Sequence, residues 1–338
     1  VEVARRGSIP TTPSWNSISS SARDSFGYEE ISLDASLGAL RIGENVLAIH
    51  GLNRSVTDVD FFLSPQLAIA LRSEDSTLAL DDTTGSWTLT TGTIKNGTIS
   101  TSESAIFGAT GGKLDGVTLA TDLTTSNTIT IMNGLTLAGS KINLQTSKGK
   151  LSFSDGQSEL GGTGTIQLLP DGSGYGGYVS GVGNLTIGEN ILIQGRGYVT
   201  APNGTLTNLG TIRANWGGGG YISVNGSSVV NAGTFEAVSG GQLYLYNFAQ
   251  NAGSIRSGTG SLVLVNGALG NAASGELIVD IGGIASSAYG RINSTGVATL
   301  GGSLSVSLVN GFEPAAGNSF GVLSFASRTG DFTAVTGT

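Results

Sequence analysis

The sequence predicts an all-β protein built around a right-handed parallel β-helix. First, a unit of about twenty residues repeats over residues 203–277, and one such unit alone cannot bury its apolar face. Second, each unit contains short alternating runs of branched or aromatic side chains bounded by Gly, Asn or Ser, which is typical of strands. Third, the 338 residues include 55 glycines and show no amphipathic helical period. Together these observations indicate a solenoid.

The beginning of the chain differs in composition from the rest. The first eighty residues hold 16 of the 40 charged side chains but only 5 of the 55 glycines. Such a shift marks a domain boundary, and we place a separate domain at residues 1–75. Strands are expected there at Val1–Arg5, Tyr28–Leu33 and Asn45–His50.

Three segments of this domain carry a family resemblance. They are Val1-Glu-Val-Ala-Arg-Arg6, Tyr28-Glu-Glu-Ile-Ser-Leu33 and Gly43-Glu-Asn-Val-Leu-Ala-Ile-His-Gly-Leu-Asn53. These segments resemble the later strands of a galactose-binding-like jelly roll, similar to the sugar-binding domain of β-galactosidases. The module occurs in large secreted surface proteins of planctomycete-type bacteria. The resemblance implies a partial jelly roll in a bacterial protein located outside the cell.

Residues 76–296 are expected to form the β-helix itself. Short strands with Gly punctuation recur there, for example at Trp87–Ile94, Lys113–Leu119 and Gly164–Leu168. They resemble the rungs of autotransporter-type and adhesin-like β-helices. At roughly twenty residues per rung, the segment predicts about 11–12 rungs.

The last segment, residues 297–338, differs again. Ala298–Leu308 is a long alternating strand, and further strand-like runs follow it. This pattern resembles the closing segment of extracellular β-helix passengers. Because a terminal rung exposes an open edge, solenoids need a cap. We therefore predict antiparallel capping strands here.

Four asparagines recur at one place in the repeat, 23, 20 and 20 residues apart. They are Asn208, Asn231, Asn251 and Asn271. A glycine follows each of the first three two residues later, as a turn requires. Asparagine tolerates left-handed backbone at bends, and stacked amides can hydrogen-bond along the axis. We interpret the row as a structural ladder, with a polar recognition stripe as the alternative.

Aromatic residues provide the sharper surface signal. If Leu243, Leu245, Leu262 and Leu264 point inward, alternation directs the residues between them outward. The candidate binding residues are then Tyr244, Tyr246, Val263 and Val265, with Trp216 and Tyr221 nearby. An exposed apolar patch of this kind indicates binding. Sugar stacking, contact with a neighbouring chain and cover for a loop all remain open.

The sequence offers little for catalysis or metal binding. It contains no cysteine and a single histidine, and its acidic residues in the β-helix are dispersed. Sugar hydrolysis needs two carboxylates at a set separation, and no rung shows a convincing pair. A Gly-Gly-x-Gly-x-Asp calcium repeat is also missing. We therefore expect no enzyme activity, no cofactor and no metal site.

The net charge of −8 argues against nucleic acid or an anionic membrane as partner. No apolar run reaches the roughly 18 residues needed to span a bilayer. We expect an extracellular structural or adhesive cell-surface protein that self-associates, head-to-tail or laterally, into a filament or surface layer. A carbohydrate-binding module and a polysaccharide-degrading enzyme are the alternatives. Without an initiator Met or a signal peptide, we expect a processed product or a fragment.

Overall fold

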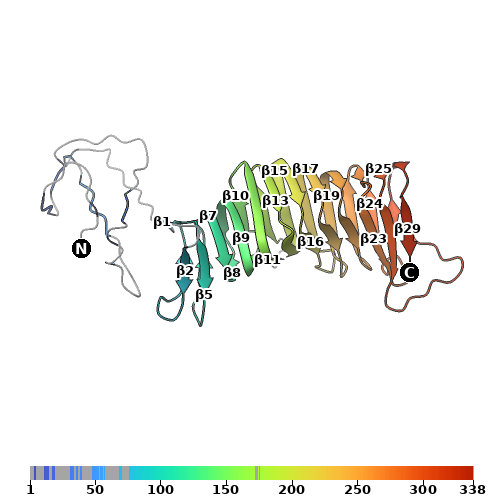
Figure 1. The fold of residues 1–338 in the computed structure, drawn as a ribbon, viewed down its shortest axis with the longest axis horizontal. Helices are drawn as coiled ribbons and strands as arrows, with labels where there is room; N and C mark the ends of the chain where they lie inside the picture. The colour runs from blue at the N-terminus through green and yellow to red at the C-terminus, as the bar shows by residue number, and fades with distance from the viewer. Residues whose placement is uncertain are drawn as a thin grey trace. The chain divides into compact units, whose positions relative to one another are not determined.

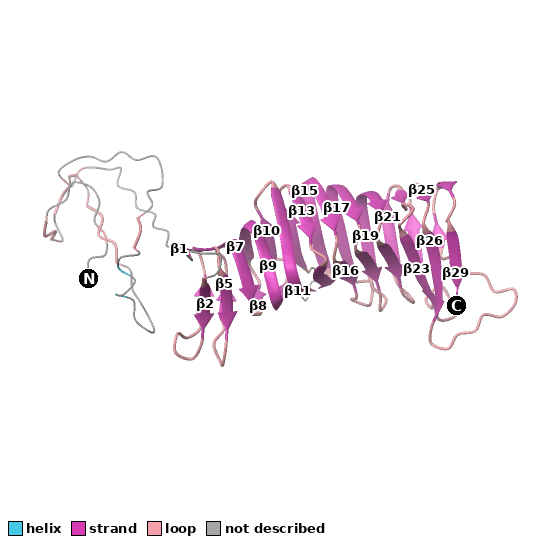
Figure 2. Ribbon diagram, in the orientation of Figure 1, coloured by secondary structure: helices cyan, strands magenta, loops and turns pink. Residues whose placement is uncertain are grey.

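The structure is a computed structural model that describes residues 68–70, 76–171, 174 and 176–337, with scattered residues between 4 and 57. The chain forms two compact units, residues 1–67 with 83–85 and residues 68–82 with 86–338. The second unit is an all-β parallel solenoid of about ten turns, which confirms the predicted fold class (Figures 1 and 2). The predicted jelly roll falls mostly on residues outside the described part and stays a prediction.

Each full turn of the solenoid crosses three faces, which we number in chain order. The first face contains β1 (Ala68–Ala70), β4 (Thr93–Lys95), β10 (Lys150–Phe153), β12 (Gly177–Gly181), β21 (Leu262–Asn266), β24 (Arg291–Ser294) and β27 (Leu323–Ser324). The second contains β2 (Thr77–Leu80), β5 (Thr98–Thr101), β13 (Asn184–Ile187), β22 (Leu269–Gly270), β25 (Val297–Leu300) and β28 (Ser327–Gly330).

The third face contains β3 (Trp87–Leu89), β6 (Phe107–Ala109), β8 (Leu123–Thr125), β14 (Asn190–Gly195), β16 (Thr211–Ala214), β18 (Thr234–Ala237), β20 (Ser254–Ser257), β23 (Glu276–Ile281), β26 (Ser303–Leu308) and β29 (Ala334–Gly337). Longer strands bend from the first face onto the second: β7 (Lys113–Ala120), β15 (Gly197–Asn208), β17 (Tyr221–Asn231) and β19 (Gln242–Asn251). Two more reach the third face: β9 (Thr128–Gln145) and β11 (Gln157–Leu169).

The core is a continuous apolar column along the axis of the solenoid. Strand residues alternate between the interior and solvent, as in β19, where Leu243 and Leu245 are fully buried. Phe153 and Phe235 are among its largest fully buried side chains. Since every turn stacks in parallel on the next, the backbone groups between turns are paired and each turn buries its neighbour's apolar surface.

The observed number of turns, about ten, is lower than the predicted 11–12. Early turns have the expected length, since Thr93 pairs with Lys113, 20 residues later. The last turns are longer: 29 residues separate Leu264 from its partner Asn293, and 31 separate Asn293 from Ser324. The loops 282–290 and 309–322 lie in these longer turns, so a uniform twenty-residue period overestimates the count.

The antiparallel cap predicted for residues 297–338 is wrong for the described strands. β26 pairs with β29, and β25 with β28, in parallel register. These strands therefore continue the three-faced winding to residue 337 (Figure 1). Alternating apolar residues and glycine punctuation specify a strand and its turns, but they do not encode the direction of its partner.

The four asparagines of the predicted ladder stack at the corner where the second face ends. Asn208, Asn231 and Asn251 are fully buried, and Asn271 is nearly so. Each Nδ2 donates to the Oδ1 of the next asparagine, at 2.8, 2.7 and 2.7 Å. The carboxamide row therefore satisfies polar groups that burial would otherwise penalise.

Glycine is required beside this row because successive turns approach closely. A Cβ at Gly233 would lie 2.2 Å from the carbonyl oxygen of Gly210. A Cβ at Gly253 would lie 2.2 Å from the carbonyl oxygen of Gly233. Any larger residue would separate the turns, so the Asn-x-Gly pattern encodes both the corner and its tight stacking.

Candidate ligand-binding site

The candidate site lies on the first face, where four outward-facing positions stack on consecutive turns. Tyr178 of β12 pairs with Tyr198 of β15, which pairs with Ser223 of β17, which pairs with Tyr244 of β19. The residues beside them along the strands, such as Val199, are buried. Strand alternation thus directs a row of half-buried tyrosines, interrupted by one serine, toward solvent.

The tyrosine rings pack on one another across the turns. Tyr178 stacks on Tyr198 with ring centroids 4.5 Å apart and planes within 10° of parallel. Tyr221, at the start of β17, meets Tyr198 edge-on at 6.0 Å and stacks on Tyr244 at 5.0 Å. Such contacts hold large side chains in fixed orientations. The rings therefore form a preorganised aromatic wall.

A groove lies along this wall. Tyr198 and Tyr244 lie two turns apart, about 10 Å at the usual strand spacing, with Ser223 between them in the pairing and the ring of Tyr221 packed between their rings. This tyrosine groove has a volume of about 370 Å³. Its lining consists of Tyr198, Thr200, Tyr221, Ser223, Asn225, Tyr244 and Tyr246. None of these seven residues is acidic.

Hydrogen bonds orient the phenol groups at the groove. The hydroxyl oxygens of Tyr198 and Tyr221 are 3.0 Å apart and share a hydrogen bond. The Tyr244 hydroxyl donates to Oε1 of Gln242. Burial, followed by the nearby phenols of Tyr246 and Tyr221, raises the pKa of Tyr244 above its ordinary value of 10.0. At neutral pH the Tyr244 hydroxyl is therefore uncharged and can donate a hydrogen bond.

Three of the six predicted binding residues line the groove: Tyr221, Tyr244 and Tyr246. Trp216 is 40% exposed in the turn before β17 and is not part of the lining.

The prediction that Val263 and Val265 face outward is wrong, because both are fully buried. Val263 pairs with the buried Leu243, so Leu262 and Leu264 take the outward positions. A run that alternates leucine with valine is apolar at every position, and its hydropathy cannot identify the inward face.

Sequence reasoning missed Tyr198 and Thr200 as site residues. A signal for them exists, because Gly177-Tyr178-Val179 and Gly197-Tyr198-Val199 lie 20 residues apart. Both tyrosines occupy one position on adjacent turns. The repeat of the tripeptide at the solenoid period could have identified an aromatic row.

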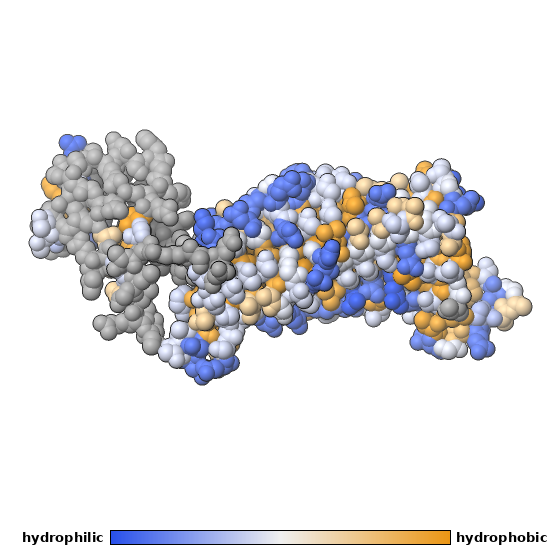
Figure 3. Space-filling view, in the orientation of Figure 1, coloured by the Kyte–Doolittle hydropathy of each residue, from blue (hydrophilic) through white to orange (hydrophobic). Residues whose placement is uncertain are grey.

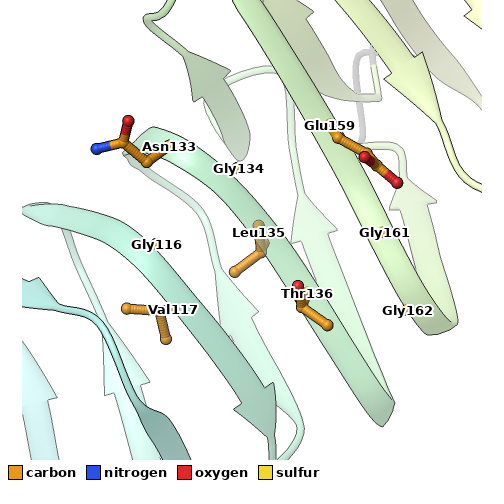
Figure 4. Close-up of a pocket in the computed structure, with 9 residues that line it drawn as sticks. All are labelled: Gly116, Val117, Asn133, Gly134, Leu135, Thr136, Glu159, Gly161 and Gly162. Atoms are coloured by element: carbon orange, nitrogen blue, oxygen red, sulfur yellow. The ribbon is translucent and has the colours of Figure 1, made fainter. Parts of the chain in front are cut away.

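A second hollow, of about 230 Å³, lies over β7, β9 and β11 (Figure 4). Its lining contains four glycines, and Glu159 supplies its carboxylate. Asn133 also lines the hollow, but its amide points away from the hollow, and its Nδ2 donates a hydrogen bond to Oδ1 of Asp115 at 2.6 Å. With a single acidic group and no aromatic ring, this hollow lacks the elements of a sugar or catalytic site.

Ion pairs on the third face neutralise the arginines and carboxylates there. Arg213 Nε lies 2.6 Å from Glu236, and Arg256 lies 2.8 Å from Asp280. The hydrogen bond to Asp280 raises the pKa of Arg256. In the described part of the chain, no group of three or more His, Cys, Asp or Glu side chains is arranged to hold a metal ion.

Elsewhere on the solenoid, apolar side chains are mixed with polar ones in the view of Figure 3 and are denser at its C-terminal end. The described residues include no helix with the length and hydropathy of a membrane span. No protein-family model, curated protein or solved structure matches the chain.

Proposed function

We propose that the chain is an extracellular adhesive β-solenoid that binds glycans in the tyrosine groove. The observation that carries the proposal is the groove lined by Ser223 and by the side chains of Tyr198, Tyr221 and Tyr244. Sugar rings present apolar C–H faces, which pack on aromatic rings, and hydroxyl groups, which need hydrogen-bond partners. The groove offers both kinds of contact.

The polar side of the groove matches this ligand class. Thr200 and Asn225 pair with each other two residues along the same strands from Tyr198 and Ser223, and they supply one hydroxyl and one amide. Ligand sites typically combine apolar surface with a few fixed polar groups in a volume of roughly 300–1,000 Å³. The tyrosine groove combines these features on an open surface, which suits a segment of a longer saccharide chain.

The scaffold also supports a binding role. Stacked turns fix the relative positions of the groove residues, because each belongs to a strand paired on both sides. Little side-chain ordering then remains to be done on binding, which favours affinity. Location outside the cell, bacterial origin and assembly into filaments or layers stay predictions, and the glycan site depends on none of them.

The test is titration calorimetry of the purified chain against a panel of neutral and acidic oligosaccharides. We expect saturable binding, weakened about tenfold or more by each of Tyr198→Ala and Tyr244→Ala, because each removes one aromatic contact surface. The matched control is Tyr289→Ala, since Tyr289 packs edge-on against Phe320 at 5.6 Å, outside the groove lining.

Retention of binding in Tyr289→Ala together with its loss in the two groove variants would support the proposal. Failure of every oligosaccharide to bind the parent chain would overturn it. Binding that survives in both groove variants, with folding verified by circular dichroism, would place any sugar site elsewhere.

A further inference from the structure

We infer that the glycan bound in the tyrosine groove is acidic and carries carboxylate or sulfate groups. This inference rests on the proposed glycan function and adds the chemical class of the ligand. It follows from the distribution of charge on the first face, which differs from that of the chain as a whole.

The first face pairs Lys95 with Asp115 near its start, but from β10 to β24 its strand segments carry cations without carboxylates. From β10 to β24, its charged strand residues are Lys150 and Arg291, and Arg196 immediately precedes β15. No aspartate or glutamate occurs in these strand segments. The chain nevertheless contains 24 acidic and 16 basic residues, so the groove lies on a local exception to the acidic balance.

Two of these cations lie at the N-terminal side of the aromatic row. Lys150 pairs with Tyr178, the first ring of the row. The guanidinium carbon of Arg196 lies 5.8 Å from the ring centroid of Tyr221, which lines the groove. A glycan that lies in the groove and extends toward Tyr178 would thus bring its substituents near both positive groups.

The positive charges of Lys150, Arg196 and Arg291 are not neutralised by any carboxylate in the described part of the chain. Within the described part of the chain, none of the three forms a salt bridge, whereas Arg213 and Arg256 on the third face bind Glu236 and Asp280. An arginine or lysine near a carboxylate or sulfate forms a charge-assisted hydrogen bond, which is stronger than a neutral one. The groove would therefore distinguish an acidic glycan from its neutral counterpart.

A single-stranded nucleic acid could also combine stacking with cationic contacts. The net charge of −8 disfavours it, because a nucleic acid carries a phosphate at every nucleotide and its affinity depends on many phosphate contacts. Three separated cations suit an intermittently charged chain better than a continuous row of phosphates.

The test compares two ligands that differ only in charge: a uronic acid oligosaccharide and the same oligosaccharide after carboxyl reduction. We expect the acidic form to bind the parent chain about tenfold more tightly at low salt, with the difference shrinking as ionic strength rises. Arg196→Gln and Lys150→Gln should each weaken binding of the acidic form more than binding of the reduced form, because each removes one positive charge. Lys141→Gln is the matched control, because Lys141 is exposed on the third-face part of β9.

Equal affinity for the two forms would overturn this inference and leave the proposed function intact. Absence of binding to both forms and to every other oligosaccharide would overturn both. Tighter binding of a homopolymeric single-stranded oligonucleotide, lost in Tyr244→Ala, would assign the groove to nucleic acid instead. Equal loss of preference in Lys141→Gln would show a general charge effect and would also count against the inference.

Discussion

The asparagine ladder and the tyrosine groove occupy opposite ends of the same three strands. β15, β17 and β19 begin at the groove on the first face and end at the buried corner of the second. At the corner, each turn repeats one residue and bonds it to its copy. At the groove, Ser223 interrupts the row of tyrosines, and the ring of Tyr221 packs between Tyr198 and Tyr244 instead. The repeated residue at the corner stabilises the stack, whereas different residues on successive turns line the groove.

The largest effect that would test this contrast is loss of a central ladder member. Asn251→Ala should lower the free energy of unfolding by about 1–3 kcal/mol, because it leaves Oδ1 of Asn271 without its donor in a buried site. Urea unfolding of the variant and the parent chain measures the difference. Glycan binding at the groove should be retained at temperatures where the variant is folded.

The control for that variant is Asn266→Ala, since Asn266 is exposed at the end of β21. A surface substitution of this kind should change stability by less than about 0.5 kcal/mol. Equal losses in the two variants would mean that the amide row contributes no more than an ordinary surface asparagine, and the contrast between corner and groove would fail.

A smaller effect is expected at the first member of the ladder. Asn208 Oδ1 is buried and has no hydrogen-bond partner in the described part of the chain, since the preceding turn places Ile187 beside it. Asn208→Ala removes this unsatisfied atom along with the donor to Asn231. The resulting loss in free energy of unfolding should therefore be about 1 kcal/mol smaller than the loss caused by Asn251→Ala.

Urea unfolding of Asn208→Ala beside Asn251→Ala measures that difference. A loss at Asn208 equal to or larger than the loss at Asn251 would show that position along the row does not matter.

The smallest effect concerns the groove and its response to pH. Because burial raises the pKa of Tyr244 in the folded chain, the folded state retains this proton at pH values where the unfolded state has lost it. The stability contributed by the neutral phenol is therefore present below pH 10 and is lost as pH rises through the folded pKa. Difference absorbance of the parent chain and Tyr244→Phe should show one phenol that titrates above the ordinary range.

A Tyr244 signal that titrates with the exposed phenols would contradict that expectation. It would mean that the groove is more open to water than the packing of Tyr221 and Tyr246 around this side chain indicates.

Much of the fold could be predicted from the sequence because its repeats are chemically explicit. The Asn-x-Gly pattern at Asn208, Asn231 and Asn251 marks one corner, since amide stacking and close approach of turns require those residue types. The direction of the last strands could not be predicted in this way, because apolar alternation is the same for parallel and antiparallel partners.

The site was harder to predict because it depends on register rather than on residue type. In the strand pairing Ser223, not Tyr221, lies opposite Tyr244. The ring of Tyr221, two residues before Ser223, nevertheless stacks on Tyr244. The turns that join these strands differ in length, so a fixed period does not align them. The prediction for the run from Leu262 to Val265 is wrong for a different reason: every position of the run is apolar, so only its pairing with β19 identifies the inward face.

The ladder has a direction as well as a place. All three inter-asparagine bonds run from Nδ2 on one turn to Oδ1 on the following turn, so the amide dipoles align and reinforce one another. If one side-chain amide flipped and exchanged its oxygen with its NH₂ group, two oxygens would face each other on one side of it and two NH₂ groups on the other. The amides of the row can therefore reverse only together. The corner therefore holds a row of aligned dipoles whose negative end is at Asn208. A turn that packs against this end would meet a partial negative charge instead of a neutral surface.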